Sequence, residues 1–298
     1  MQRKLLSALL AVMIILSSAL FSSCGGESDY PVSFDEVTIQ QEPERIVVLS
    51  KNLADIISTM GYDVKMVGRS DEVTQKGLQV VPSVGSAQSP SAASIDEVKA
   101  EVVFSDAQGL DPSAEKAIKA KKIPIIKLDT AATPKQVRGI YKRTARILEG
   151  NVTGKKAGAE SYDKLSETLK SVRDAAVSES DIIKTIAYLY MEDGVLKTFN
   201  QNTWGSTMLG LTGATNVFKS ADTDVVDIKA LALSNPDFIF CADKETQAYL
   251  SSQKDLKKLS ALKTSFILPY DEITMQGNTA LSVLEDMLKK MYPEEFSS

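Results

Sequence analysis

The feature that most restricts the fold is an alternation of apolar, β-branched runs with amphipathic segments, broken once in mid-chain. The runs cover residues 45–50, 64–68, 102–105, 123–128, 185–191, 195–199, 238–241 and 266–268. Between them lie segments with helical spacing at 52–60, 91–100, 112–120, 207–211, 228–233, 247–262 and 279–291. Because most of these runs lack polar alternation, they indicate strands buried on both faces of parallel sheets. Strands alternating with helices predict an α/β fold. A further short edge strand is expected at 32–39.

The break in this alternation is a stretch of helical spacing without a strand. Residues 134–149 and 153–176 each carry an apolar stripe, and Gly150-Asn151 separates them. The second segment has no strand companion, which is typical of a connector. We therefore expect two Rossmann-like lobes with central parallel sheets, joined by a single long α-helix. The predicted boundaries are an N-terminal lobe at 32–152, a connecting helix at 153–180 and a C-terminal lobe at 181–298.

The first residues resemble an export signal. Arg3 and Lys4 precede an apolar run at 5–20 that is too short for a comfortable membrane span. Small residues before Cys24 fit the lipobox of bacterial lipoproteins, although Phe21 stands where leucine is usual. We expect a signal peptide at 1–23, lipid attachment at Cys24, a flexible tether at 24–31 and a place on the outer face of the cell membrane. The alternative is ordinary signal cleavage beside a coincidental cysteine.

Composition excludes several classes of function. The chain has no histidine, which removes His-dependent catalytic triads, His-zinc sites and His-ligated haem. Besides Cys24 it has only Cys241, expected as a buried, inert thiol. Signal cleavage would remove two of the 34 basic residues and none of the 39 acidic ones, so the net charge becomes −7. We expect no nucleic-acid partner, no resident metal or cofactor and no enzymatic activity.

A set of motifs in order along the chain resembles one protein family. Residues 43–50 (PERIVVLS) are similar to "P-x-R-I-V-x-L-S", residues 209–217 (LGLTGATNV) to "L-x-x-L-G-G-x-N-V", and residues 234–240 (SNPDFIF) to "l-N-P-D-v-I-f". The family is the siderophore, haem and cobalamin type of periplasmic binding protein. The resemblance implies two lobes bridged by one long helix and only modest closure on the ligand. It also implies a monomer that delivers a bulky organic or metal-chelate ligand, itself carrying iron or cobalt, to an ABC permease and its ATPase.

Candidate ligand contacts follow from the strand ends. In open parallel sheets, ligands bind beyond the carboxyl ends of the strands. This rule points to the loops that contain Asp106 and Asp129, and it nominates Ser50, Lys51, Asn52, Arg69, Gln88, Gln108, Tyr190, Asn202, Trp204 and Tyr270. Aromatic area from Trp204 and the tyrosines suits a partly apolar ligand, and Lys51 and Arg69 suit an anionic chelate. For each of these residues a core or solvated surface role is the alternative.

Two positions depart from the family pattern. The resemblance implies a glutamate near the start of one helix in each lobe for docking to the permease, but Ala93 and Lys229 occupy those positions. Asp96, Glu97 and Asp227 lie close by as substitutes. A ferric siderophore is the first ligand expected and a corrinoid the second. The alternative function is a surface lipoprotein that scavenges or senses a ligand without a transporter.

Overall fold

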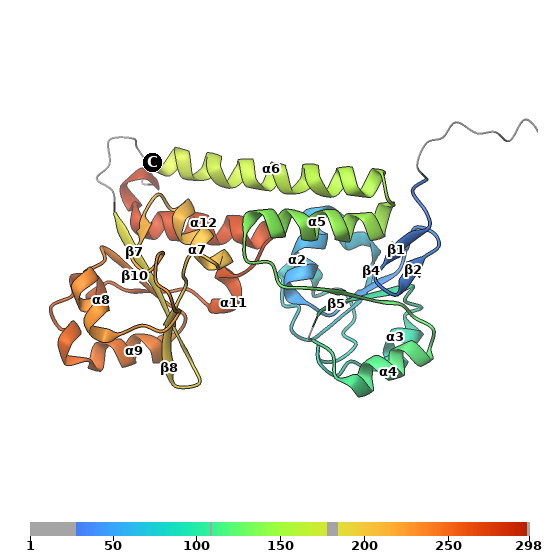
Figure 1. The fold of residues 1–298 in the computed structure, drawn as a ribbon, viewed down its shortest axis with the longest axis horizontal. Coiled ribbons are helices and arrows are strands. Elements are labelled where there is room, and N and C mark those ends of the chain that lie inside the picture. Colours follow the sequence, from blue (N-terminus) through green and yellow to red (C-terminus); the bar gives the residue numbers. More distant parts are fainter. Residues whose placement is uncertain (1–27, 108, 178–183, 297–298) are drawn as a thin grey trace, which may run out of the picture.

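The computed structural model describes residues 28–107, 109–177 and 184–296. Within them two α/β lobes lie side by side beneath a long helix (Figure 1). The expected two-lobed α/β fold with parallel sheets is thereby confirmed. The predicted signal peptide, Cys24 and Gln108 lie outside the described residues.

The N-terminal lobe is built on a parallel sheet of strand order β4-β3-β5-β6. Its strands are β3 (Ile46–Val48), β4 (Met66–Arg69), β5 (Val102–Asp106) and β6 (Ile125–Leu128). Its helices are α2 (Lys51–Thr59), α3 (Ala92–Glu97) and α4 (Pro112–Ala120). All of β3 is buried, because helices and loops cover both faces of the sheet, as the unbroken apolar run predicts.

The expected edge strand at 32–39 is instead a separate hairpin. β1 (Val32–Phe34) and β2 (Val37–Ile39) pair with each other in an antiparallel, two-stranded sheet. The prediction of one strand was wrong because Asp35 adopts a φ of 48°, a left-handed conformation that aspartate tolerates and that reverses the chain.

The C-terminal lobe has a mixed sheet of order β11-β10-β7-β8, with β9 also paired to β7. Its strands are β7 (Thr185–Glu192), β8 (Val195–Thr198), β9 (Thr215–Asn216), β10 (Phe238–Cys241) and β11 (Phe266–Ile267). Its helices are α7 (Trp204–Leu211), α8 (Ile228–Ser234), α9 (Lys244–Ser252), α10 (Ser260–Lys263) and α11 (Tyr270–Ile273). The predicted β7–β8 hairpin is present, and its two-residue turn has positive φ at both Asp193 and Gly194.

Three helices tie the lobes together. α5 (Pro134–Glu149) and α6 (Thr153–Ala176) form an antiparallel pair, and α12 (Asn278–Met291) packs beneath the other half of α6 (Figure 1). A Cβ on Gly158 of α6 would stand 2.4 Å from the carbonyl oxygen of Tyr141 in α5. A Cβ on Gly154 would stand 2.1 Å from that of Ala145. These two glycines therefore allow the two backbones to touch. None of the described helices is both long and apolar enough to cross a membrane.

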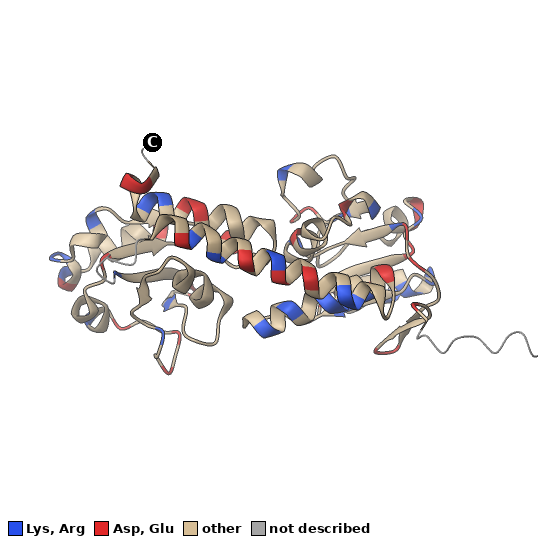
Figure 2. Cartoon of the chain, turned by 90° about the horizontal axis from the view of Figure 1, so that it is seen from above, with Lys and Arg blue, Asp and Glu red and all other residues tan. Residues whose placement is uncertain are grey.

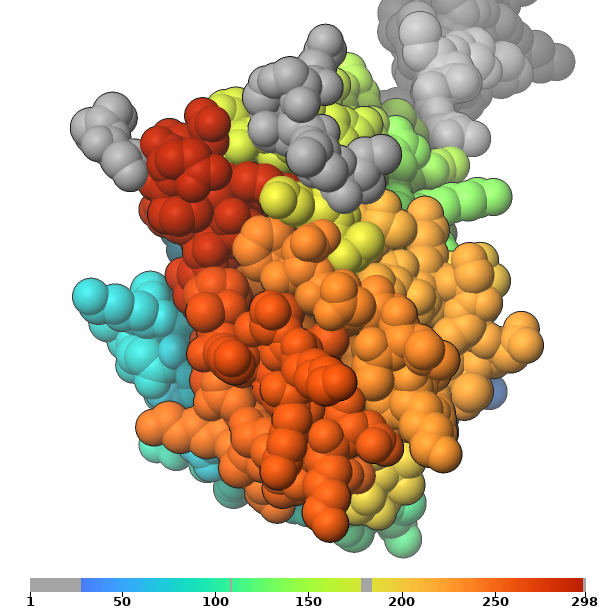
Figure 3. Space-filling view, turned by 90° about the vertical axis from the view of Figure 1, so that its left-hand side faces the viewer, coloured from blue at the N-terminus to red at the C-terminus, as the bar shows by residue number. Residues whose placement is uncertain are grey.

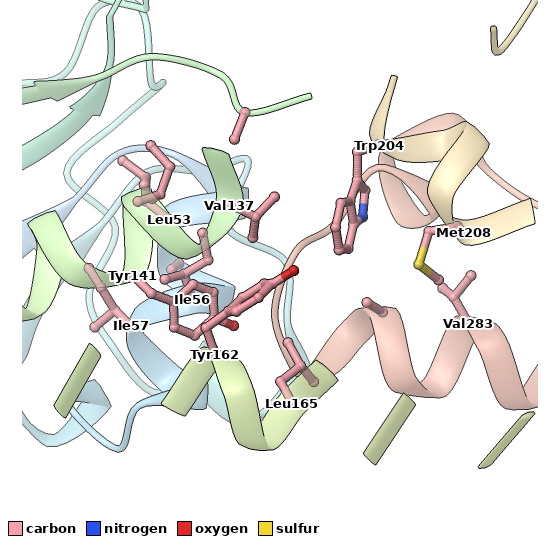
Figure 4. Close-up of a cluster of buried hydrophobic side chains, with 14 of the residues drawn as sticks. Leu53, Ile56, Ile57, Val137, Tyr141, Tyr162, Leu165, Trp204, Met208 and Val283 are labelled. Carbon is pink, nitrogen blue, oxygen red and sulfur yellow. The ribbon is translucent and has the colours of Figure 1, made fainter. Parts of the chain in front are cut away.

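One buried core runs through both lobes. The same cluster of apolar side chains contains Leu53 and Tyr141 on the N-lobe side and Trp204, Met208 and Val283 on the C-lobe side (Figure 4). Smaller clusters fill the outer face of each sheet. Seen end-on (Figure 3), C-lobe atoms in orange fill most of the face, and N-lobe atoms in blue and cyan project only at its margins. The shared core restricts how far the lobes can separate.

We expect Gly158→Ala to lower the free energy of unfolding by about 1–3 kcal/mol, because the added methyl group overpacks the α5–α6 contact. Denaturant unfolding followed by Trp204 fluorescence measures the change. The control is Gly139→Ala in α5, where a Cβ meets nothing within 4 Å. That variant should be neutral or more stable by up to about 1 kcal/mol. Equal effects of the two substitutions would contradict the close approach of the helices.

Candidate functional site

The carboxyl ends of three N-lobe strands meet the C lobe at a cavity of about 230 Å³. Both lobes contribute to its lining, which consists of Asn52, Leu53, Asp106, Asp129, Thr130, Ile140, Tyr270, Thr274 and Gln276. Asn52, Asp106 and Asp129 follow or end β3, β5 and β6. The cavity therefore lies where ligands bind in open parallel sheets.

The floor of the cavity is a polar link between the lobes, centred on Gln276. Asn52 donates from Nδ2 to Oε1 of Gln276 at 3.1 Å and accepts from the Gln276 backbone N–H at 2.9 Å. Gln276 also donates from Nε2 to the carbonyl oxygen of Ala131 at 2.6 Å. Its own carbonyl oxygen accepts from the hydroxyl of Tyr141 at 2.8 Å. These four bonds hold Gln276 in one orientation.

Asp55 extends this link to the start of α12. Its carboxylate accepts from the Gly277 N–H at 2.7 Å and from the Thr279 hydroxyl at 2.8 Å. The Thr279 N–H also points to it, and a Cβ on Gly277 would stand 2.6 Å from Asp55 Oδ2. Asp55 in the N lobe thus caps a helix of the C lobe. We call residues 275–279 and the α2 side chains that bind them the inter-lobe link.

Burial shifts the titration of Asp55. Desolvation raises its pKa, and the hydrogen bonds from Thr279 and Gly277 offset only part of that rise. The Asp55 carboxyl group therefore binds its proton more tightly in the folded protein than in the unfolded chain. The contribution of Asp55 to stability is fully present below its unfolded pKa and declines as pH rises through its folded pKa.

The cavity is lined by carboxylates and lacks a free cation among the described residues. Neither Asp106 nor Asp129 has an ion-pair partner among these residues. Desolvation raises the pKa of Asp106, and a hydrogen bond from Ser50 offsets part of that rise. Lys51 is ion-paired with Asp271 of the other lobe. The described residues hold no group of three histidine, cysteine, aspartate or glutamate side chains arranged to bind a metal ion.

Tyr270 and Tyr190 form an aromatic wall beside the cavity on the C-lobe side, and Phe199, which is only 2% exposed, backs them. The ring of Tyr270 lies 4.8 Å from that of Tyr190 and 5.6 Å from that of Phe199, measured between centroids. Tyr270 is 43% exposed, so its ring is available from solvent. Burial raises the pKa of the Tyr190 hydroxyl above its ordinary value.

The predicted contacts divide into those near the cavity and those elsewhere. Asn52 and Tyr270 line it, and Lys51 and Tyr190 make the contacts described above. Arg69 instead binds the Ser70 carbonyl oxygen and Gln79 of its own lobe. The remaining described candidates do not line the cavity. Ser50 caps α2, and Gln88 and Asn202 are exposed. Trp204 is buried.

Trp204 is buried in the hydrophobic core rather than exposed at the cavity. It is only 5% exposed, and its indole N–H donates to the carbonyl oxygen of Met275 at 2.8 Å. In Figure 4 it lies within the shared core. Its aromatic area suggested ligand contact, but the residue belongs to α7 and its ring turns inward against the inter-lobe link.

Comparison with known proteins identifies the family. A model described as periplasmic binding protein matches residues 46–267, from the first residue of β3 to the last of β11. The chain belongs to the periplasmic binding protein family. Its members bind solutes, and this binding protein is accordingly not an enzyme.

Individual relatives agree with this assignment. The chain is 24% identical to YvrC of Bacillus subtilis, an uncharacterised ABC transporter substrate-binding lipoprotein, over 95% of this chain and 96% of that protein. A periplasmic solute-binding protein of Staphylococcus epidermidis superposes with a TM-score of 0.70 at 16% identity, over 85% of this chain and 100% of that one. The periplasmic haem-binding protein HutB of Vibrio cholerae gives 0.70 at 14% identity, with the same coverage. These structures share the two-lobed fold.

The positions associated with permease docking are exposed in this binding protein. Ala93 lies in the first turn of α3 and Lys229 in that of α8, and both face solvent. Asp96 is paired with Lys121 at 2.8 Å, and Asp227 caps α8 through the N–H groups of Lys229 and Ala230. Glu97 is exposed and has no ion pair within the described part of the chain.

Sequence reasoning missed Gln276, Thr274, Leu53 and Ile140 of the cavity lining. The strand-end rule, applied to β11, reaches Tyr270 and Asp271 but not the turn after α11 that carries Gln276. Gly277 before a helix was the available signal, because a glycine there permits close approach of another backbone.

We expect Asp55→Ala to lower the free energy of unfolding by about 2–4 kcal/mol, because it leaves N–H groups of Gly277 and Thr279 without partners. Hydrogen exchange at these two amides should accelerate beyond the global effect. Asp243→Ala is the matched control, since it removes a cap within the C lobe alone. It should cost about 1 kcal/mol and leave exchange at Gly277 unchanged relative to the global rate. If both variants behave alike, Asp55 does not join the lobes.

Proposed function

We propose that this binding protein is an extracytoplasmic lipoprotein that captures a bulky metal chelate between its lobes and passes it to an ABC permease. The observation that carries the proposal is the cavity lined from both lobes, with the aromatic wall of Tyr190 and Tyr270, backed by Phe199, beside it. A site with apolar area and a few fixed polar groups suits a large, partly apolar ligand.

The charge of the site refines the ligand class. The cavity is smaller than the roughly 300–1,000 Å³ of typical ligand pockets. Most of the ligand would therefore lie outside the cavity, against the aromatic wall, with one edge of the ligand directed at Asp106 and Asp129. Carboxylates favour an edge that carries positive charge or hydrogen-bond donors. A ferric siderophore or a corrinoid with such an edge fits better than haem, whose propionates would meet these carboxylates.

Titration with a panel of ferric siderophores, corrinoids and haem tests the proposal. We expect saturable binding of one class, reported by Trp204 fluorescence because that ring is bonded to the inter-lobe link. Tyr270→Ala should weaken binding about tenfold through loss of ring contact, and Tyr270→Phe should retain most of the affinity. Tyr249→Ala, an exposed tyrosine of α9 outside the cavity, is the control and should bind normally. Equal loss in Tyr249→Ala and Tyr270→Ala, or no saturable ligand, would refute this site.

Lipid attachment at Cys24 is the second part of the proposal. It is supported by the residues that precede Cys24 and by the relative that is named a lipoprotein. Cys24→Ser should abolish incorporation of labelled fatty acid and release the protein from the membrane fraction. Cys241→Ala is the control, because that thiol is buried, and it should remain labelled and membrane-bound. Continued labelling of Cys24→Ser would disprove the attachment site.

A ligand scavenger or sensor that works without a transporter is the alternative function. The exposed Ala93 and Lys229 favour it, because neither can form an ion pair with an arginine of a permease. A permease gene and an ATPase gene beside the gene for this chain would support the importer, and their absence from the genome would support the alternative.

A further inference from the structure

A basic groove lies on the α5–α6 helix pair, away from the ligand cavity. It has a volume of about 730 Å³, and its charged lining residues are all cationic: Lys142, Arg143, Arg146 and Lys155. A shallower hollow of about 400 Å³ adjoins it across Lys142 and Lys155. Figure 2 shows basic residues along the length of α5, whereas acidic and basic residues alternate on α6.

The described residues leave most of the positive charge of the groove without an ion-pair partner. Lys142, Arg143 and Lys155 have no ion-pair partner among the described residues. Arg146 donates to neutral oxygens, Asn151 Oδ1 at 2.7 Å and the Ser33 carbonyl at 2.9 Å. By contrast, Arg138 of the same helix pairs with Asp163 through two bonds of 2.8 and 2.7 Å. A cluster of uncompensated cations on a chain of net charge −5 is a local feature that suits an anionic surface.

The groove lies beside the first described residues, close in sequence to the lipid attachment proposed at Cys24. Ser28, the first described residue, lines the groove. The next residue, Asp29, is fixed, since its carboxylate accepts from the Val152 and Thr153 N–H groups, both at 2.8 Å. The Thr153 hydroxyl also donates to this carboxylate at 2.7 Å, and this bond together with the two N–H bonds lowers the pKa of Asp29. Cys24 is four residues before Ser28, a span of at most about 14 Å. A lipid on Cys24 therefore keeps the groove close to the headgroup layer.

We propose that the basic groove docks on anionic phospholipid headgroups of the membrane that holds the protein. The inference rests on the lipid attachment proposed above. The groove supplies a second, electrostatic contact in addition to the lipid, and each cation near an anionic leaflet strengthens association roughly fivefold. Such contacts weaken at high salt because the Debye length shortens. Docking would hold the α5–α6 face of the N lobe against the membrane in a resting orientation, from which the protein must turn to present α3 and α8 to a permease (Figure 1).

Headgroup quenching on the reconstituted lipoprotein tests this contact. In the lipidated protein, Gly139→Cys provides a thiol in the groove to which a dye is attached. The other two cysteines do not react, because the lipid blocks Cys24, and Cys241 is buried with its pKa raised to about 12. It is placed in vesicles of phosphatidylcholine alone or with phosphatidylglycerol, each with a headgroup quencher. We expect stronger quenching with phosphatidylglycerol and loss of the difference at high salt. A dye at Lys258→Cys, exposed on the C lobe, should show no such difference.

Matched charge reversals distinguish an effect of the groove from an effect of the net charge of the protein. The triple variant Lys142→Glu, Arg143→Glu and Lys155→Glu should lose the phosphatidylglycerol-dependent quenching. Lys254→Glu, Lys257→Glu and Lys258→Glu change the charge equally on the C lobe and should retain it. Equal quenching in both vesicle types, or equal behaviour of the two triple variants, overturns the docking. Flotation of the protein with vesicles is measured first, because it tests lipid attachment separately from docking. If the protein does not float, lipid attachment is refuted and this inference with it. If it floats but shows no charge-dependent quenching, docking alone is refuted.

Discussion

The capping of α12 by Asp55 is the interaction on which the arrangement of the lobes depends. A carboxylate in the N lobe satisfies N–H groups at the start of a C-lobe helix. Such groups have no partner within their own helix and would be costly to bury unpaired. Asn52 and Tyr141 bind the preceding residue, Gln276, so N-lobe side chains fix the backbone on both sides of Gly277. The relative position of the two sheets follows from these contacts and from the core that they share beneath α6.

The candidate site inherits its rigidity from the same contacts. Gln276 and Asn52 belong both to the inter-lobe link and to the cavity lining, so the floor of the cavity is already ordered. A preordered floor reduces the conformational entropy that a ligand must remove. Recognition would then depend on the aromatic wall of the C lobe and on Asp106 and Asp129 of the N lobe, which have no ion-pair partner among the described residues.

Sequence patterns predicted local structure well and long-range contacts poorly. Helical segments at 134–149 and 153–176 were expected from their apolar stripes and the Gly150-Asn151 break, which are local signals, and α5 and α6 occupy them. The rule that parallel strands end at a common edge nominated Asn52 and Tyr270, and both line the cavity. The contact of Asp55 with Gly277 joins residues 222 positions apart, and no local pattern marks it. Trp204 was nominated for ligand contact, yet its ring is buried in the shared core and bonded to the Met275 carbonyl oxygen.

The attachment of Asp29 to the first turn of α6 has a mechanical consequence. Residues 29–33 are clamped to the α5–α6 turn, since Asn151 also binds the Pro31 carbonyl and Arg146 the Ser33 carbonyl. A pulling force applied to the chain before Asp29 is therefore shared between the backbone that leads into β1 and the hydrogen bonds at the start of α6. Because α6 packs on both α5 and α12, that load spreads to both lobes together instead of peeling the N-terminal hairpin away first.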